Sequence, residues 1–186
     1  MFNLPYKCLM KSSNFLSVCG VIVTLLSCSG ANAVDNSTVK DFDLQKYLGT
    51  WYEQARYDHS FERGLTHCTA QYSLRPDGKV RVLNRGLKNG KPRESEGKAK
   101  LTKTPGLLRV SFWGPFYSDY RVLMLGPNYS YALVGSSSDK YLWILSRTPL
   151  LPEDTILKIL NEATRRGYDV SKLIWVNQQK AKYTAS

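Results

Sequence analysis

From Phe42 onward, the sequence is a succession of short segments in which apolar and polar residues alternate, and turn residues separate the segments. Successive side chains of a strand point to opposite faces, so this alternation is typical of strands with one face in a core. The turn Pro76-Asp77-Gly78 is one of the separators. Strands with this spacing predict an all-β domain built as an up-and-down antiparallel barrel.

The same alternation predicts which side chains face the barrel interior. In the later strands, which are apolar on both faces, the assignment depends on the family named below. The predicted inward residues are Trp51, Glu53, Ala55, Cys68, Ala70, Tyr72, Leu74, Val80, Val82, Asn84, Gly97, Ala99, Leu108, Val110, Phe112, Tyr120, Val122, Met124, Ala132, Val134, Tyr141, Trp143, Leu145 and Arg147.

A helix is expected after the barrel. Pro152-Glu153-Asp154 suits a first helical turn, and Arg165-Arg166-Gly167 suits a last turn and its stop. The apolar stripe that should dock on the outside of the barrel is formed by Ile156, Ile159, Leu160 and Ala163. Leu173 to Val176 then predicts a short closing strand.

Residues 1–27 have the pattern of an export signal, with Lys7 and Lys11 before an apolar run that is too short for an ordinary membrane span. Two processing sites compete. Leu25-Leu26-Ser27-Cys28 resembles a bacterial lipobox, in which Cys28 becomes lipidated, and Ala31-Asn32-Ala33 resembles an ordinary cleavage site. We favour the lipobox. The residue after Cys28 is Ser29, whereas an aspartate at this position would retain a lipoprotein in the inner membrane. This favours the outer membrane, facing the periplasm.

These boundaries divide the chain into four parts: the signal peptide, a lipidated N-terminus and tether over residues 28–41, a barrel domain over 42–179 and a tail over 180–186. In the mature chain Cys68 would be the one free thiol, so no disulfide within the chain is expected.

The chain carries a formal net charge of +11, but its Lys and Arg residues are scattered and match no nucleic-acid motif. A basic exterior suits an anionic membrane surface. An evenly charged, soluble surface explains the composition equally well.

Five motifs in order give the chain a specific resemblance. They are residues 47–53 with Gly49-Thr50-Trp51-Tyr52, residues 58–65 with His59-Ser60-Phe61, residues 95–99, residues 110–117 with Trp113-Gly114-Pro115-Phe116, and residues 141–149 with Ser146-Arg147-Thr148-Pro149. The sequence from about Phe42 to Gln179 is similar to the lipocalin family, in particular its bacterial outer-membrane group.

The resemblance implies an eight-stranded barrel that holds fatty acids, lysophospholipids or similar lipids in membrane maintenance under stress. It also implies a structural floor in which Trp51, following Gly49, lies across the closed end and Arg147 covers it by a cation–π contact. No cofactor and no metal are expected. The sequence leaves open whether the protein forms a homodimer.

Ligand contacts are predicted on the inner wall at Glu53, Ala55, Tyr72, Val82, Asn84, Val110, Phe112, Tyr120, Val122 and Trp143. Arg56, His59 and Arg63 lie near the expected open end, where an arginine would pair with a phosphate or carboxylate head group. The alternative for the aromatic residues is a barrel filled by its own side chains. Glu53 is costly inside unless a tyrosine or an arginine pairs with it.

Two other function classes remain open. Cys68 is similar in position to the nucleophile of the lipocalin-type prostaglandin D synthase, which suggests a lipid isomerase, although the chemistry needs a thiolate and His67 should face away. An interaction protein would instead have a filled barrel and use its exposed loop. A metal site of Asp58, His59, Glu62 and His67 has little support from their spacing.

Overall fold

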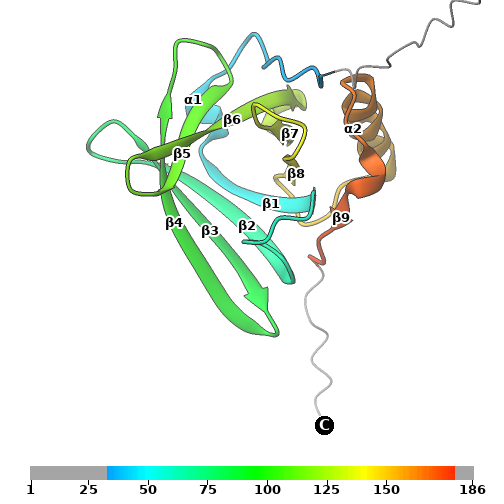
Figure 1. Cartoon of the computed structure of the whole chain (residues 1–186), viewed down its shortest axis with the longest axis horizontal. Coiled ribbons are helices and arrows are strands. Elements are labelled where there is room, and N and C mark those ends of the chain that lie inside the picture. Colours follow the sequence, from blue (N-terminus) through cyan, green and yellow to red (C-terminus); the bar gives the residue numbers. More distant parts are fainter. Residues whose placement is uncertain (1–32, 179–186) are drawn as a thin grey trace, which may run out of the picture. The chain divides into compact units, whose positions relative to one another are not determined.

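The computed structural model describes residues 33–178, in which eight strands close into an antiparallel barrel (Figure 1). The export signal, Cys28 and the tail 180–186 lie outside the described residues. Each strand pairs with the next, and β1 also pairs with β8, which closes the ring. The strands are β1 Gly49–Arg56, β2 Leu65–Leu74, β3 Val80–Lys88, β4 Lys91–Leu101, β5 Leu107–Trp113, β6 Phe116–Leu125, β7 Tyr131–Gly135 and β8 Leu142–Ser146. The predicted all-β barrel is confirmed.

Four short elements and one long helix complete the domain. They are α1 Leu44–Tyr47, η1 Pro127–Tyr129, α2 Glu153–Arg165, η2 Val170–Lys172 and β9 Ile174–Trp175. The strand β9 lies within the predicted short closing strand, and it pairs with the end of β1. Within residues 33–178 no helix is long and apolar enough to cross a bilayer.

The strand directions define two ends of the barrel. At the closed end β1 begins and β8 ends, and α1 lies just before the first residue of β1. At the open end β1 finishes at Arg56 and the loop 57–64 leads to β2. The loop 136–141 between β7 and β8 belongs to the same open end.

Helix α2 covers the outside of the barrel (Figure 1). Ile159 and Ala163 are fully buried, and they pack in one cluster with Leu133 and Ile144 of β7 and β8. The helix ends at Arg165, and Gly167 follows with a φ of +88°, a conformation in which glycine has no Cβ penalty. The predicted helix and its docking face are therefore confirmed.

Two predicted inward residues, Ala55 and Met124, lie on the outer face of the barrel instead. Both pack in the cluster beneath α2. The pairing of β1 with β8 shifts between Glu53 and Ala55, and the pairing of β6 with β7 shifts between Val122 and Met124. Each bulge inserts one residue and so exchanges the two faces beyond it. The prediction of Ala55 as a ligand contact is wrong for this reason.

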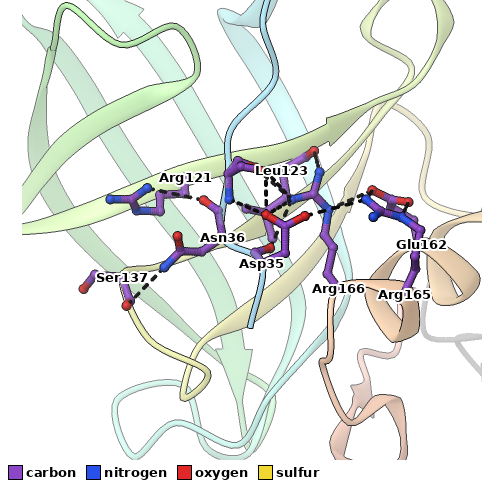
Figure 2. Close-up of polar contacts among 9 residues, drawn as sticks. Asp35, Asn36, Arg121, Leu123, Ser137, Glu162, Arg165 and Arg166 are labelled. Carbon is purple, nitrogen blue, oxygen red and sulfur yellow. Dashed lines mark hydrogen bonds and ion pairs between the residues drawn. The ribbon is translucent and has the colours of Figure 1, made fainter. Parts of the chain in front are cut away.

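The segment from Val34 to Asp41 is docked on the barrel, and the expectation of a free tether there is wrong. The Val39 amide donates to the Val122 carbonyl at 2.9 Å, and the Asp35 amide donates to the Arg166 carbonyl at 2.8 Å. The Arg166 guanidinium donates to the carbonyls of Asp35 and Leu123, which joins the segment to α2 and β6 (Figure 2). Ordered structure thus begins before the predicted boundary at Phe42.

Candidate functional site: the barrel interior and its mouth

The closed end of the barrel has the predicted floor. Trp51 is fully buried, and the Arg147 guanidinium carbon lies 3.8 Å from its ring centroid. Arg147 also donates to the backbone carbonyls of Lys46, Leu48 and Thr50 at 2.7 to 2.9 Å. Gly49 has a φ of +96°, which L-residues with a Cβ rarely adopt. Arg147, which directly follows β8, therefore connects α1 and the start of β1 to the end of β8.

A tyrosine cluster fills the space above this floor. Tyr47 of α1 packs against the rings of Trp51 and Tyr72, with centroids 4.8 and 5.4 Å apart. The Tyr120 hydroxyl is hydrogen bonded to those of Tyr47 and Tyr72, at 2.7 and 2.8 Å. The polar groups of Tyr72 and Tyr120, predicted to contact ligand, are thus occupied by each other.

Much of the remaining predicted wall is apolar and faces the interior. Val82, Val110, Val122 and Trp143 pack in the inner core with Tyr72 and Tyr120. Phe112 lies toward the open end of β5, where its ring covers Gly97 so closely that a Cβ there would approach Cδ1 to 2.8 Å. Phe112 is still 40% exposed. Asn84 brings a side-chain oxygen that is buried and has no hydrogen-bond partner within residues 33–178.

At the open end, the buried side chains of Glu53, Arg56 and His59 lie beside the half-buried Glu62 and Trp143. We call Glu53, Arg56, His59, Glu62 and Trp143 the mouth cluster. Arg56 donates to the Glu53 carboxylate at 2.6 Å and to the Glu62 carbonyl at 2.7 Å. The Glu62 carboxylate accepts a hydrogen bond from Trp143 Nε1 at 3.1 Å. The loop 57–64 is thereby fastened to the barrel from the inside.

Burial and charge both perturb the titration of this cluster. Burial raises the pKa of Glu53 to about 8, and the neighbouring Glu62 carboxylate adds to this against the pull of Arg56. Burial also raises the pKa of Glu62. Burial and Arg56 lower the pKa of His59 to about 4, so the imidazole is neutral at neutral pH. The two carboxylates titrate as a pair and retain a proton more readily than solvated ones.

The predicted head-group residues have different environments from those expected. Arg56 is 2% exposed and committed to Glu53, and His59 is 5% exposed and stacked against Phe61. Arg63 is exposed, but both oxygens of Asp58 accept from its guanidinium. Arg56 and Arg63 thus already have carboxylate partners.

Sequence reasoning named Glu62 only for a weakly supported metal site and missed its inward position in the mouth cluster, because an acid in a loop ordinarily faces water. The alternation pattern carries no signal that would have found it. Within residues 33–178 no group of three His, Cys, Asp or Glu side chains is arranged to hold a metal ion.

Cys68 lies beside the mouth cluster, with its sulfur 3.8 Å from Arg56 Nη1. Burial, and after it the Glu53 charge, raises the pKa of the thiol to about 12. A thiolate is therefore strongly disfavoured at neutral pH. A bulge lies between Thr66 and Thr69, so the simple alternation used to orient His67 does not hold there. His67 Nδ1 is hydrogen bonded to the Thr66 hydroxyl.

Comparison with known proteins agrees with this architecture. The lipocalin-like domain matches residues 42–178. Outer membrane lipoprotein Blc of Escherichia coli (strain K12) is 51% identical over 146 residues, which cover 76% of this chain and 82% of that protein. Outer membrane lipoprotein Blc of Vibrio cholerae is 46% identical over 172 residues, covering 89% and 98%.

A solved structure, that of insecticyanin from the tobacco hornworm Manduca sexta, aligns with a TM-score of 0.64 over 78% of this chain and 85% of its own, at 24% identity. That likeness supports the fold. The sequence relatives and the domain match carry the assignment further: the chain belongs to the lipocalin family, and its relatives include the bacterial outer membrane lipoproteins.

Proposed function

We propose that the protein is a lipid-anchored lipocalin of the outer membrane that binds fatty acids or lysophospholipids in its barrel, in membrane maintenance under stress. The observation that carries the proposal is the apolar inner wall. Toward the open end of β5, Phe112 lies over Gly97 and is 40% exposed. Each methylene of a bound acyl chain that leaves water there contributes about 0.8 kcal/mol. Binding of this kind needs no catalytic group, and the raised pKa of Cys68 gives no support to thiol chemistry.

The membrane part of the proposal rests on the lipobox at Cys28 and on the names of the bacterial relatives. Acylation of Cys28 would hold the protein to the membrane by two or three chains, which is effectively permanent. Replacement of Cys28 by Ala should abolish incorporation of an acyl label and release the protein into the soluble periplasm. Cys68→Ser is the matched control and should keep the label. Unchanged membrane retention of Cys28→Ala would contradict the anchor.

Lipid binding is tested by native mass spectrometry of the Cys28→Ala chain, as purified and again after delipidation and incubation with a mixed lipid extract. One discrete bound lipid per chain is expected. Val110→Trp should reduce the bound fraction by filling the inner wall, whereas Leu157→Trp on the exposed face of α2 should not. Protein that stays bare in both samples would refute lipid binding and favour the interaction class.

A further inference from the structure

Positive charge is unevenly distributed over the outside of the barrel. Residues 91–113, which form β4, β5 and the loop between them, contain six Lys or Arg residues and two Glu residues, a net charge of +4. Residues 153–172, which form α2, η2 and their connection, contain four basic and four acidic residues, a net charge of zero. The excess positive charge therefore lies over these strands and not over the helix.

The lysines of this region lie on the outer face of the barrel. Ala99 is fully buried in the inner core, so Lys98 and Lys100, its neighbours in β4, face outward. Lys100 pairs in register with Arg109 of β5, and Lys103 follows shortly after the end of β4. We call Lys98, Lys100, Lys103 and Arg109 the basic wall.

Within residues 33–178, the three lysines of the basic wall form no ion pair. The acidic side chains of the neighbouring strands are bound by arginines instead. Glu96 pairs with Arg81 at 2.7 Å, and Asp119 pairs with both Arg109 and Arg121, at 3.3 and 3.0 Å. One carboxylate therefore serves two guanidinium groups, and the lysine charges remain available to an anionic partner.

Apolar groups lie among these charges. The ammonium groups of Lys98 and Lys100 lie 5.9 and 4.6 Å from the ring centroid of Tyr117. Leu101, the last residue of β4, is 50% exposed. A tyrosine and an exposed leucine among lysines suit the boundary between a bilayer and water, where acidic head groups attract the lysines.

The segment from Val34 to Asp41 brings the N-terminal end of the domain close to the basic wall. Thr38 Oγ1 donates to the carbonyl of Pro105 at 2.6 Å, in the loop that joins β4 to β5. Cys28 lies six residues before the start of this segment, and six residues span at most about 20 Å. A membrane that holds an acylated Cys28 is therefore within reach of this side of the barrel.

The length of the tether alone allows two faces of the domain to meet the membrane, because the same segment also contacts the end of α2 through Arg166. Charge distinguishes the two faces, since an acidic bilayer attracts the basic wall and has no net attraction for α2 and η2.

We propose that the basic wall docks the domain on an anionic lipid surface. The wall belongs to the side of the barrel, so the barrel axis would lie along the membrane and the open end would remain uncovered. This inference rests on the proposed membrane location, but it does not depend on what the barrel holds.

The test is sedimentation of the Cys28→Ala chain with vesicles, because any binding without acyl chains comes from the protein surface. Vesicles of two parts phosphatidylcholine and one part phosphatidylglycerol are compared with vesicles of phosphatidylcholine alone. We expect binding to the acidic vesicles only, and release at an ionic strength of about 1 M, where the Debye length is about 3 Å. Equal binding to both kinds of vesicle, or binding to neither, would overturn the proposal.

The contact is located by a triple variant, Lys98→Gln, Lys100→Gln and Lys103→Gln, in the same chain. Each basic residue near an acidic surface contributes about fivefold to binding, so the partition coefficient should fall about a hundredfold. None of the three side chains has an ion pair within residues 33–178, so the variant should fold normally.

The matched control removes three charges outside the basic wall, by Lys140→Gln in the loop 136–141, Lys158→Gln in α2 and Lys172→Gln in η2. Its partition coefficient should fall by less than about fivefold. An equal loss in the two triple variants would show that net charge alone drives binding, and it would overturn the assignment to the basic wall.

The orientation is measured with an environment-sensitive fluorophore on a single cysteine, in a Cys28→Ala, Cys68→Ser chain. Emission from Leu101→Cys, beside the basic wall, should shift to the blue on acidic vesicles. Leu157→Cys on α2 is the matched control, because Leu157 is 53% exposed, and its emission should stay unchanged. A shift at Leu157 and none at Leu101 would place the membrane on the helix and overturn the proposal.

Docking is separated from the proposed function by two further results. Val110→Trp, which fills the inner wall, should bind acidic vesicles as well as its parent chain does, and a loss of binding would assign the effect to lipid uptake by the barrel. If acidic vesicles bind the Cys28→Ala chain but the wild-type protein takes up no acyl label, the anchor fails and the docking surface stands.

Discussion

Replacement of Arg166 by Ala should destabilise the domain and release the segment from Val34 to Asp41. The guanidinium is 8% exposed and donates to the carbonyls of Leu123 and Ser37, both at 2.8 Å, and of Asp35 at 3.1 Å (Figure 2). It also pairs with Glu162 at 2.8 Å. Loss of the donor leaves the buried Leu123 carbonyl unpaired, at about 1–3 kcal/mol.

The bonds to Asp35 and Ser37 and the Glu162 pair contribute less, because water can reach these groups once the arginine is gone. Together we expect a loss of about 3–4 kcal/mol in the free energy of unfolding. Arg166→Lys keeps the charge but lacks the planar fork that reaches three carbonyls, so it should lose about half as much.

The assay is urea unfolding of both variants, combined with amide hydrogen exchange. The Val39 amide, which donates to Val122, reports whether the segment stays docked. In Arg166→Ala its protection should fall well below that of the β7 amides, which report on the barrel. A loss below about 1 kcal/mol with Val39 still protected would refute the reasoning.

Three other perturbations test the site. Arg147→Met removes the cation–π contact with Trp51 and three hydrogen bonds to backbone carbonyls, so urea unfolding should show a loss of about 3 kcal/mol in the free energy of unfolding. A loss under about 1 kcal/mol would contradict the stabilising role of Arg147 at the closed end. Cys68 should react with a thiol reagent at pH 8 only as fast as the domain opens, since its pKa is about 12, and rapid labelling of the native protein would contradict this. The pKa of Glu53 is raised to about 8 from 4.5, so the folded state holds more protons than the unfolded state, and the free energy of unfolding should fall as pH rises through this range. Glu53→Gln should make the free energy of unfolding less dependent on pH. Equal slopes of this free energy against pH for both proteins between pH 5 and 8 would contradict the prediction.

The sequence predicts the strands and much of the wall because both follow from local alternation. Val82 and Val110 face the interior as expected, and the spacing of the family motifs placed Arg147 on Trp51. Ala55 and Met124 were misassigned because a bulge shifts the parity by one residue, and no residue type in these strands marks one.

Two further features depend on partners distant in the sequence. Residues 34–41 are polar, which is typical of a linker, and their docking depends on Arg166, more than a hundred residues away. Glu62 faces inward because Arg56 binds its carbonyl and Trp143 its carboxylate. Neither contact has a local signal in the sequence.

The arginines of this basic protein explain why its net charge of +11 is a poor guide to its ligand. Arg56, Arg147 and Arg166 each bind two or more backbone carbonyls, and they fasten the loop 57–64, the closed end and the N-terminal segment respectively. A guanidinium suits this role because its five donors lie in one plane and its charge survives partial burial. Arginines committed to carbonyls and carboxylates cannot also neutralise an anionic lipid. The formal charge of the chain therefore says little about what the mouth of the barrel binds.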